Sequence, residues 1–473
     1  MKNIPVVKGL ILALFVFAAI AVKANTLNVN TSNYTTSDNS SSAPHPNMFL
    51  DASEIASIKA KIDAGQEPWV EAYNTAISRA NTALNQPLIS VRDGGSNWDT
   101  GVYDGNFSEN RHDYRAVGDI SHAVRDLGIA YAFSGNEAYA DKAIALIYHW
   151  CLNPTSLMKP QFNGGQSLIE LTITLPAMFY GADMLWNYSG WDTVQKAGFI
   201  TWVETISAES RANNEVAPTN NFGTWRLMFL ASAAVITENS DMMTYVVDFY
   251  KVLLPYQIHH TGFFPWEFNR DSPKNGLFYS TFAMVAATQI CEIVRHHGVD
   301  LYHWEASNGN GSIERGLDYM APFVADPSTW AQTGGTYTYT GENAAVYELA
   351  YAIWQKPAYK KVIERWGRPM YGSYVQGPLT LTHAFRNLTV DVPQLEVESD
   401  IIIYPNPTSN IFTINLKNDI LKRAIIFNRL GQQVKEVTTR EVNISDLPSG
   451  IYFVKISSQS GKVAIKKVVK NES

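Results

Sequence analysis

A helical period runs through most of this chain and limits the folds open to it. From Met48 to about Phe385, apolar residues recur at three- and four-residue spacing, which is the pattern of amphipathic helices. Many of these segments begin at Asp, Ser or Glu and end at Gly or Asn, as capped helices do. Successive helices predict a toroid or an α-solenoid. Because no fixed-period repeat is visible, we expect a mainly α protein with an α/α toroid, an incomplete barrel, at 48–385.

The pattern changes abruptly near Val397, where short alternating stretches replace the helical period. Turn sequences such as Asn-Pro and Pro-Ser-Gly separate these stretches, so residues 399–473 predict a small β-sandwich, reached by a linker at 386–398. The charge changes as well. From Ile401 onward 11 Lys and Arg face 5 Asp and Glu, net +6, whereas the preceding 400 residues hold 26 and 39, net −13. We therefore expect two separate domains.

Residues 1–24 have the composition of a secretory signal peptide. Lys2 and Lys8 accompany an apolar stretch that ends at Val22-Lys23-Ala24, a small-residue cleavage pattern. A membrane anchor is the alternative, but the stretch is shorter than the roughly 20 residues that span a bilayer. Residues 25–47 are rich in Ser, Thr and Asn and predict a low-complexity linker. No later segment reads as long and apolar enough to cross a membrane, so we expect an exported protein without a stable membrane span.

Composition and motifs exclude several functional classes. The sequence has no nucleotide-binding loop, no basic stripe for nucleic acid and no metal-ligand cluster, so we expect no cofactor, no metal and no nucleic-acid partner. Cys151 and Cys291 lie in apolar helical contexts, which indicates buried thiols, although one disulfide stays open. The 12 Trp and 24 Tyr suit stacking on sugar rings or a large helical core.

Two polar segments stand directly before long apolar runs of the helical region. The first runs from Asn220 to Trp225 and the second from Glu267 to Ser280. A structural role explains each segment taken alone, because Asn caps helices, Gly favours turns and an Arg on a loop is usually solvated. Only their combination points to a site.

Together the segments resemble the alginate lyase family that folds as an α/α toroid, whose site holds an Asn-Asn-His-Gly-Thr-Trp motif and a later Arg and Tyr. The likeness extends to the helical stretch that contains Asp113-Tyr114. It implies that Asn221 neutralises a substrate carboxylate, that Tyr279 is the catalytic Tyr and that Arg270 is the Arg before it. Phe222 departs from the motif, because it stands where the family has histidine. We expect the substrate-binding residues to be Asn220, Gln166, Trp225, Arg115 and His112.

Cleavage of a uronate by β-elimination makes three demands on a site. The C6 carboxylate must be neutralised, the C5 proton removed and the C4 oxygen protonated. An amide and a guanidinium suit the first demand, and a Tyr beside positive charge and a helix N-terminus suits the other two. In β-D-mannuronate and β-D-glucuronate the proton and the C4 oxygen leave from one face, so one Tyr can serve both. Without the motif histidine, we expect mannuronate-rich alginate or glucuronan rather than guluronate blocks.

An acidic domain that binds an acidic polymer needs positive side chains in its cleft. The candidates near the two segments, each of which is otherwise a solvated surface charge, are Arg111, Arg115, Arg226, Arg270 and Lys274. Another histidine could also replace the missing one. The candidates are His112, His122, His259, His260, His296, His297 and His303, with His112 first because it adjoins Asp113-Tyr114.

The tail resembles the C-terminal sorting domain of the type IX secretion system of Bacteroidetes. The resemblance is carried by Tyr404-Pro405-Asn406-Pro407-Thr408, by the turn from Leu447 to Tyr452 and by the final Lys-rich strand. It implies export through the periplasm and outer membrane by the secretion machinery, and removal of the tail. A carbohydrate-binding sandwich is the alternative.

Two other functions stay open beside a lyase of anionic polysaccharides. A glycoside hydrolase on the same toroid would need two carboxylates across the cleft, for which Glu170, Asp183, Glu267 and Asp271 are candidates outside any hydrolase motif. A glycan-binding surface protein without activity would also fit the aromatic content and the lost histidine.

Overall fold

The computed structural model describes residues 44–94, 97–105, 111–159, 165–212, 220–268, 270, 275–333, 339–384, 401–417, 419–428, 433–459 and 463–471. The predicted signal peptide and the predicted linker at 386–398 lie outside the described residues, as does most of the predicted linker at 25–47. The helical part and the tail each have a hydrophobic core of their own.

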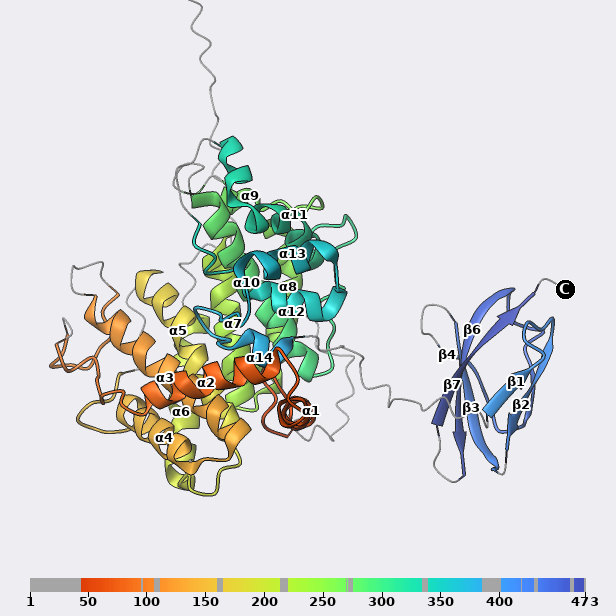
Figure 1. The fold of residues 1–473 in the computed structure, drawn as a ribbon, viewed down its shortest axis with the longest axis horizontal. Coiled ribbons are helices and arrows are strands. Elements are labelled where there is room, and N and C mark those ends of the chain that lie inside the picture. Colours follow the sequence, from red (N-terminus) through yellow and green to blue (C-terminus); the bar gives the residue numbers. More distant parts are fainter. Residues whose placement is uncertain are drawn as a thin grey trace, which may run out of the picture. The chain divides into compact units, whose positions relative to one another are not determined.

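Residues 44–384 are mainly helical (Figure 1). The helices are α1 (Ala52–Asp63), α2 (Trp69–Ala83), α3 (His112–Ser134), α4 (Glu137–Cys151), α5 (Gly165–Met184), α6 (Thr193–Ala212), α7 (Asn221–Ile236), α8 (Ser240–Gln257), α9 (Pro265–Phe268), α10 (Gly276–His296), α11 (Ile313–Ala325), the 3₁₀ helix η2 (Pro327–Thr333), α12 (Val346–Trp354), α13 (Pro357–Trp366) and α14 (Leu379–His383). The side chains of Asp51, Asn136, Asn220, Asn239 and Ser312 cap the starts of α1, α4, α7, α8 and α11, as the sequence pattern predicts.

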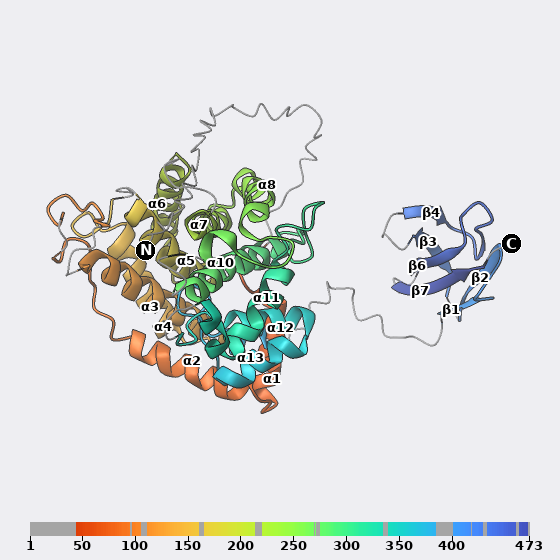
Figure 2. The ribbon, with the colours of Figure 1, turned by 90° about the horizontal axis from the view of Figure 1, so that it is seen from above.

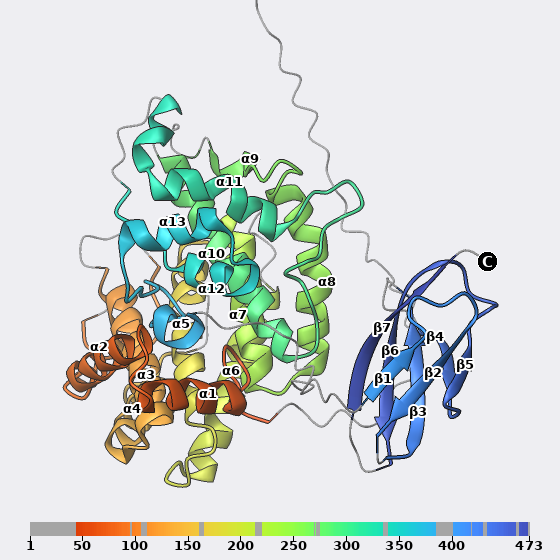
Figure 3. The ribbon, with the colours of Figure 1, turned by 45° about the vertical axis from the view of Figure 1, so that its right-hand side comes forward.

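The long helices α3, α5, α7 and α10 pack against one another in this order (Figures 1 and 3). The first two run parallel, because Gly105, just before α3, approaches Ser167 at the start of α5, and Gly128 approaches Gly181 near their ends. A Cβ on Gly128 would lie 2.4 Å from the Gly181 carbonyl oxygen, so the close approach requires glycine.

The remaining helices of this row have the same direction. α6 returns the chain from the end of α5 to the start of α7, where the Arg226 guanidinium donates to the Ser210 carbonyl at the end of α6 (2.8 Å). α7 and α10 also start at the same end, since the rings of Trp225 and Phe282, near their starts, lie 4.9 Å apart. The N-terminal ends of all four helices therefore lie on one side of the helical part.

A late segment, Met370–Gly377, fills the space between these helices. The Tyr374 ring lies 5.3 Å from Trp225 and 5.0 Å from Phe282, measured between ring centroids. The Arg125 guanidinium of α3 donates to the Tyr374 carbonyl oxygen (3.1 Å) and is 1% exposed. The segment thereby joins α3, α7 and α10 from inside the toroid.

The predicted linker at 25–47 is too long at its C-terminal end. His45 and Asn47 are buried, and their segment is held by the carboxylate of Asp183 in α5. The carboxylate lies 2.5 Å from Nδ1 of His45, and it accepts the backbone N–H groups of Asn47 (3.1 Å) and Met48 (2.9 Å). The buried Asp183 thus fixes residues 45–48 against the helical part. The composition of this segment does not reveal that contact, because Asp183 lies far away in the sequence.

The expectation about membrane-crossing segments also needs correction. Among the described residues, α10 is long and apolar enough to cross a membrane, but 89% of its apolar window is buried inside the protein. It is apolar because it lies in the core of the toroid. Cys291 in α10 and Cys151 at the end of α4 are both free and buried, so the prediction of buried thiols is confirmed.

The tail forms two antiparallel sheets around one core. Its strands are β1 (Ile401–Tyr404), β2 (Ile411–Leu416), β3 (Leu421–Phe427), β4 (Gln433–Val437), β5 (Glu441–Asn443), β6 (Gly450–Ser458) and β7 (Val463–Lys470). The sheets have the orders β1-β2-β5 and β4-β3-β6-β7. Alternate residues such as Ile414, Ile426 and Val454 are fully buried. The predicted fold class, a helical toroid with a small β-sandwich, is confirmed.

Truncation after about Leu395 should leave a helical protein that folds and keeps its activity. The reason is that the hydrophobic cores of the two parts consist of different residues, so neither core includes residues of the other part. Thermal unfolding and turnover of the shortened chain test this boundary. Aggregation, or complete loss of turnover, would show that the tail contributes to the fold of the enzyme.

Candidate active site

One end of the helical part collects the residues that the sequence singled out. α3 begins at His112, α5 at Gly165, α7 at Asn221 and α10 at Gly276, and these four ends lie on the same side. Backbone N–H groups without helical partners give each N-terminus a partial positive charge. This end therefore presents a positive field to an anionic ligand, although the chain as a whole is acidic.

A buried carboxylate holds Asn221, the first residue of α7. Glu267 in α9 accepts a hydrogen bond from the Asn221 backbone N–H (2.6 Å) and from its Nδ2 through both oxygens (2.9 and 3.0 Å). The two residues are only 1% and 3% exposed. The helix cap is Asn220, whose side chain accepts the N–H of Phe222 (3.1 Å). The expected donation from Asn221 to a substrate is therefore directed to Glu267 in this structure.

The charge of Glu267 is balanced by its neighbours. Burial raises the pKa of Glu267, while the N–H of Asn221 and the guanidinium of Arg270 act in the opposite direction. The Arg270 Nη1 lies 3.6 Å from the Glu267 carboxylate. This acid is thus part of a compact set of groups rather than an isolated charge.

Arg270 connects Glu267 to Tyr279. Its guanidinium carbon lies 4.9 Å from the centroid of the Tyr279 ring and 5.8 Å from that of Phe222, and its side chain is 26% exposed. Tyr279 is in the first turn of α10, close to the positive end of that helix. Sequence reasoning placed Asn221, Arg270 and Tyr279 in one site. In the structure Glu267 contacts Asn221 and Arg270, and Arg270 contacts Tyr279. Phe222 offers Arg270 a ring face where the family motif has an imidazole.

A second polar cluster lies at the starts of α3 and α5. Glu170 of α5, only 2% exposed, accepts hydrogen bonds from the Tyr103 hydroxyl (2.8 Å), Gln166 Nε2 (2.8 Å) and Arg111 Nη2 (2.6 Å). The Arg111 guanidinium also lies 4.2 Å from the centroid of the Tyr114 ring. Gln166, which the sequence predicted to bind substrate, is thus part of an Arg–Glu cluster.

His112 is the candidate histidine at this end of the helices. Its Nδ1 lies 3.1 Å from Asp113 Oδ1, and its side chain is 23% exposed. Asp113 is buried and also accepts the N–H of Asp104 (2.8 Å), which fixes its position. His112 and its carboxylate partner therefore form an ordered pair.

The other candidate histidines lie in a range of environments. Burial lowers the pKa of His122 to about 3 and that of His297 to about 4. His296 lies 2.9 Å from Glu54 and is nearly fully buried. The remaining three are His259 and His260, whose rings are 3.8 Å apart, and His303, which pairs with Asp300.

Two of the expected cleft residues, Trp225 and Arg226, have structural roles instead. Trp225 is 0% exposed and packs against Phe282, so direct contact with a substrate is excluded in this structure. Arg226 donates to carbonyl groups at the end of α6, where it closes a helix terminus. Arg115 is exposed on α3, where its charge acts on Asp119 one turn further along. Lys274 lies outside the described residues.

The carboxylates considered for a hydrolase do not form an accessible pair. Glu170 and Glu267 are buried and receive several hydrogen bonds each, and Asp183 holds the N-terminal segment. Asp271 lies outside the described residues. A hydrolytic pair needs an acid and a base that both face the sugar, and the three described candidates do not meet that need.

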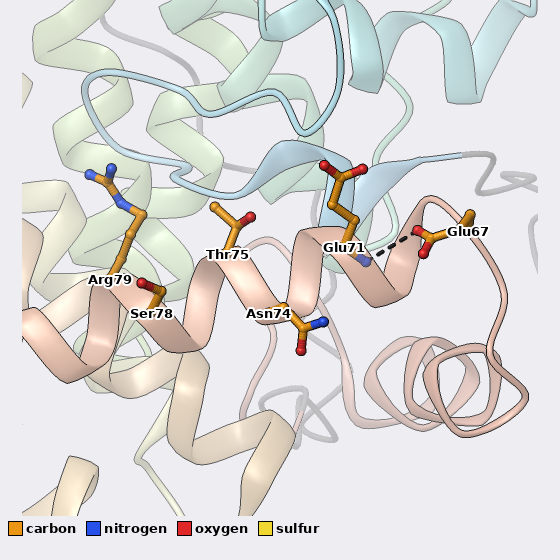
Figure 4. A pocket seen from close by; sticks show the side chains of 6 residues that line it. All are labelled: Glu67, Glu71, Asn74, Thr75, Ser78 and Arg79. Atoms are coloured by element: carbon orange, nitrogen blue, oxygen red, sulfur yellow. Dashed lines mark hydrogen bonds between the residues drawn. The ribbon is translucent and has the colours of Figure 1, made fainter.

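A pocket lies along α2 (Figure 4), and Figure 2 shows this helix at the outside of the helical part. Its volume is about 600 Å³, and it is lined by Glu67, Glu71, Asn74, Thr75, Ser78 and Arg79. Two carboxylates oppose one guanidinium in this lining, which does not favour an anionic polymer. The pocket shares no lining residue with the site at the helix ends.

Sequence reasoning missed the role of Glu267 and an exposed aromatic beside it. Glu267 was considered only as a hydrolytic acid, whereas its contacts are with Asn221 and Arg270. Trp266, its neighbour in α9, is 56% exposed, which is unusual for Trp. The sequence offered one signal for this contact. Glu267 stands three residues before Arg270, a spacing that brings two side chains together on a helix.

Comparison with known proteins adds independent information. The model of the alginate lyase family matches residues 55–330, and that of the secretion system C-terminal sorting domain matches residues 402–471. The chain is 35% identical over 89 residues to the ulvan lyase NLR42 of Nonlabens ulvanivorans, which is 18% of this chain and 16% of that protein. It is 28% identical over 116 residues to an alginate lyase of Pseudomonas syringae pv. tomato, covering 24% and 29%. These matches span less than a third of either relative.

Solved structures share the helical fold. An alginate lyase from Bacteroides ovatus superposes with a TM-score of 0.62 at 22% identity, covering 72% of this chain and 100% of that one. Alginate lyase A1-III from Sphingomonas species A1 gives a TM-score of 0.54 at 17% identity, covering 72% and 99%. At these identities the likeness establishes the fold.

Proposed function

The chain belongs to the alginate lyase family, and we propose that it cleaves a polyuronate by β-elimination, with Tyr279 transferring the protons and Arg270 and Asn221 binding the C6 carboxylate. Its tail is a type IX sorting domain, so the protein is secreted or displayed at the cell surface. We propose that it reaches that location through the periplasm and outer membrane. Its proposed partners are the anionic polysaccharide and the secretion machinery.

The observation that carries the proposal is the position of Arg270. The same guanidinium lies against the Tyr279 ring and 3.6 Å from the carboxylate that holds Asn221. A substrate carboxylate that binds Arg270 therefore brings its C5 proton toward the phenol of Tyr279. The guanidinium and the N-terminal end of α10 stabilise negative charge on that phenol oxygen.

Tyr279 alone can carry out both proton transfers of the elimination, because both occur on the same face of the sugar. The Tyr279 phenolate takes the C5 proton, negative charge develops on the carboxylate beside Arg270, and a double bond forms between C4 and C5. The C4–O bond breaks, and the proton on Tyr279 passes to the departing oxygen. The products are one unsaturated uronate and one new reducing end, and Tyr279 is again ionised.

Asn221 assists this step once its amide faces the substrate. Its Nδ2 donates to Glu267, while its buried Oδ1 has no hydrogen-bond partner among the described residues. A substrate carboxylate offers the amide a second acceptor. Burial raises the pKa of Glu267, which makes its neutral form less costly than that of an exposed acid when a second carboxylate approaches.

The helical domain is acidic overall, but positive groups near the proposed site can attract an anionic polymer at short range. Four helix N-termini and the guanidinium of Arg270 face one end of the toroid, where they act at short range. Long-range repulsion from the net charge of −13 should slow encounter, and salt should relieve it.

Mannuronate-rich alginate or glucuronan should be degraded at least about tenfold faster than guluronate blocks, because loss of one acid–base group costs more than that. Initial rates on purified blocks of each polymer test the expectation. Ulvan belongs in the same panel because one curated relative is named for it. A preference for guluronate would require a base on the opposite face, and His112 is the group we would then mutate.

A further inference from the structure

We propose that a small cavity between α10 and the Met370–Gly377 segment binds one water molecule, held by the side-chain amides of Gln289, Asn343 and Gln376. The elimination proposed above does not use this cavity, so the inference does not depend on which polymer is cleaved. The ligand class is a small neutral molecule that both donates and accepts hydrogen bonds.

The three amides come from parts of the chain that are far apart in sequence. Gln289 lies in the second half of α10, Asn343 lies just before α12, and Gln376 lies near the end of the Met370–Gly377 segment. All three line the same cavity. They are only 1%, 2% and 2% exposed, so the fold has removed these amides from bulk water.

Each of these residues carries one buried polar atom that has no hydrogen-bond partner among the described residues. The atoms are Gln289 Oε1, Asn343 Oδ1 and Gln376 Nε2. A buried polar atom without a partner is costly, so native proteins pair nearly all such atoms with protein groups or ordered water. Three of them on residues that line one cavity therefore indicate a shared ligand.

The chemistry and size of the cavity select the ligand. Two of the atoms accept hydrogen bonds, and the Gln376 amide nitrogen donates. A water molecule both donates and accepts, so it can satisfy all three, and internal waters make about three hydrogen bonds. An anion would be repelled by the two carbonyl oxygens, and a cation by the Gln376 N–H groups. The cavity volume of about 10 Å³ is close to the roughly 10–15 Å³ that one water needs.

Glu342 also lines this cavity, but its oxygens have other contacts. Its carboxylate accepts hydrogen bonds from the Thr340 N–H (3.2 Å) and hydroxyl (2.5 Å), and its backbone carbonyl accepts one from the Ser373 hydroxyl (3.1 Å). A hard cation such as Ca²⁺ takes about 6–8 oxygen ligands, which is more than the two unpartnered amide oxygens supply. The lining thus favours water over a metal ion.

The bound water connects segments that the core already brings together. The Met370–Gly377 segment packs its Tyr374 ring 5.0 Å from that of Phe282 in α10, measured between centroids. Asn343 is fixed to the same helix, because its Nδ2 donates to the Thr281 hydroxyl (3.0 Å). The water adds a hydrogen-bonded link between this amide, α10 and the Met370–Gly377 segment.

A high-resolution crystal structure of the full chain tests the proposal directly. We expect one ordered peak about 2.6–3.2 Å from Gln289 Oε1, Asn343 Oδ1 and Gln376 Nε2, the range of hydrogen bonds. An empty cavity, or amides that bind protein groups in place of a water, would overturn the proposal. Several oxygen contacts within about 2.6 Å would also overturn it, because they would identify a metal ion.

A double variant tests the role of the amides in solution. Gln289→Met with Gln376→Met keeps side chains of similar length but leaves Asn343 as the one remaining partner, so the water should be lost. Gln195→Met, which changes a partly buried glutamine of α6 outside the cavity lining, is the matched control. Magnetic relaxation dispersion of the water oxygen should detect one long-lived water fewer in the double variant than in the wild type and the control.

Equal numbers of long-lived waters in all three folded proteins would contradict the proposal. If the double variant does not fold, Gln376→Met alone takes its place, and its peak should be weaker than in the wild type because the water loses its donor. A peak of unchanged strength there would show that Gln376 does not bind the water.

Discussion

Replacing Tyr279 with phenylalanine should lower the rate of polyuronate cleavage by about 10²–10⁴-fold, the contribution typical of a general acid–base group. The change removes one oxygen from a half-buried ring that packs beside Phe278 and Arg270. The fold and the affinity for the polymer should therefore survive. With phenylalanine at position 222, no imidazole of the motif is present to take over either proton transfer.

The matched control for this variant is Tyr73→Phe. Tyr73 is a half-buried tyrosine of α2, and its loss should leave the rate unchanged. Single-turnover rates and polymer affinity measured for both variants separate chemistry from binding. A Tyr279→Phe protein that retains more than about a tenth of the wild-type rate would show that another group moves the protons. His112→Ala would then test the His112–Asp113 pair.

Asn221→Asp should reduce stability as well as turnover. It places a second carboxylate about 3 Å from Glu267, where both residues are nearly fully buried. Two carboxylates at this distance cannot both remain ionised without a large cost, and an uncompensated buried charge costs about 3–5 kcal/mol. The new carboxylate would not act as a helix cap, because Asn220 is the residue that caps α7.

The stability loss of Asn221→Asp should depend on pH with a definite sign. Burial and mutual repulsion raise the pKa of this carboxyl pair in the folded state, so the protonated form is favoured there. The deficit should be smallest below the unfolded-state pKa of about 4 and should grow as pH rises through the folded-state pKa. Chemical denaturation of the variant at several pH values measures it. Asn220→Asp, which keeps a good cap, should unfold like wild type throughout.

Wild-type stability together with wild-type turnover in Asn221→Asp would contradict this account of the site. It would mean that the contact between Asn221 and Glu267 does not contribute to the free energy of unfolding and that the amide does not bind the substrate. A stable variant with low turnover would instead show that Asn221 contributes to substrate binding but not to the stability of the fold.

The sequence predicts the architecture well because that architecture follows from local periods. The three- to four-residue spacing before Phe385 and the alternation after Val397 each reflect the side of an element that is buried. The residues Asn221, Arg270 and Tyr279 were named for a different reason, namely their resemblance to the motif of the alginate lyase family. Their spatial proximity follows from the parallel direction of α7 and α10.

The contacts that hold the site depend on residues far apart in sequence, which no local pattern reveals. Glu267 binds Asn221 across 46 positions, and Arg111 binds Glu170 across 59. Trp225 was expected to bind sugar because it belongs to the motif, yet the helices around it bury it completely. Arg226 looked like a free cation because the end of α6 that it closes is not visible in the sequence.

The most direct test of the account is the ultraviolet absorbance of the products formed from mannuronate-rich alginate. Elimination creates one conjugated double bond for each new reducing end, whereas hydrolysis creates reducing ends alone. We expect absorbance and reducing ends to rise together in a one-to-one ratio, and both to be lost in Tyr279→Phe. Reducing ends without new absorbance would identify a hydrolase, and tight binding without either signal would identify a glycan-binding protein; both results would contradict the proposed lyase.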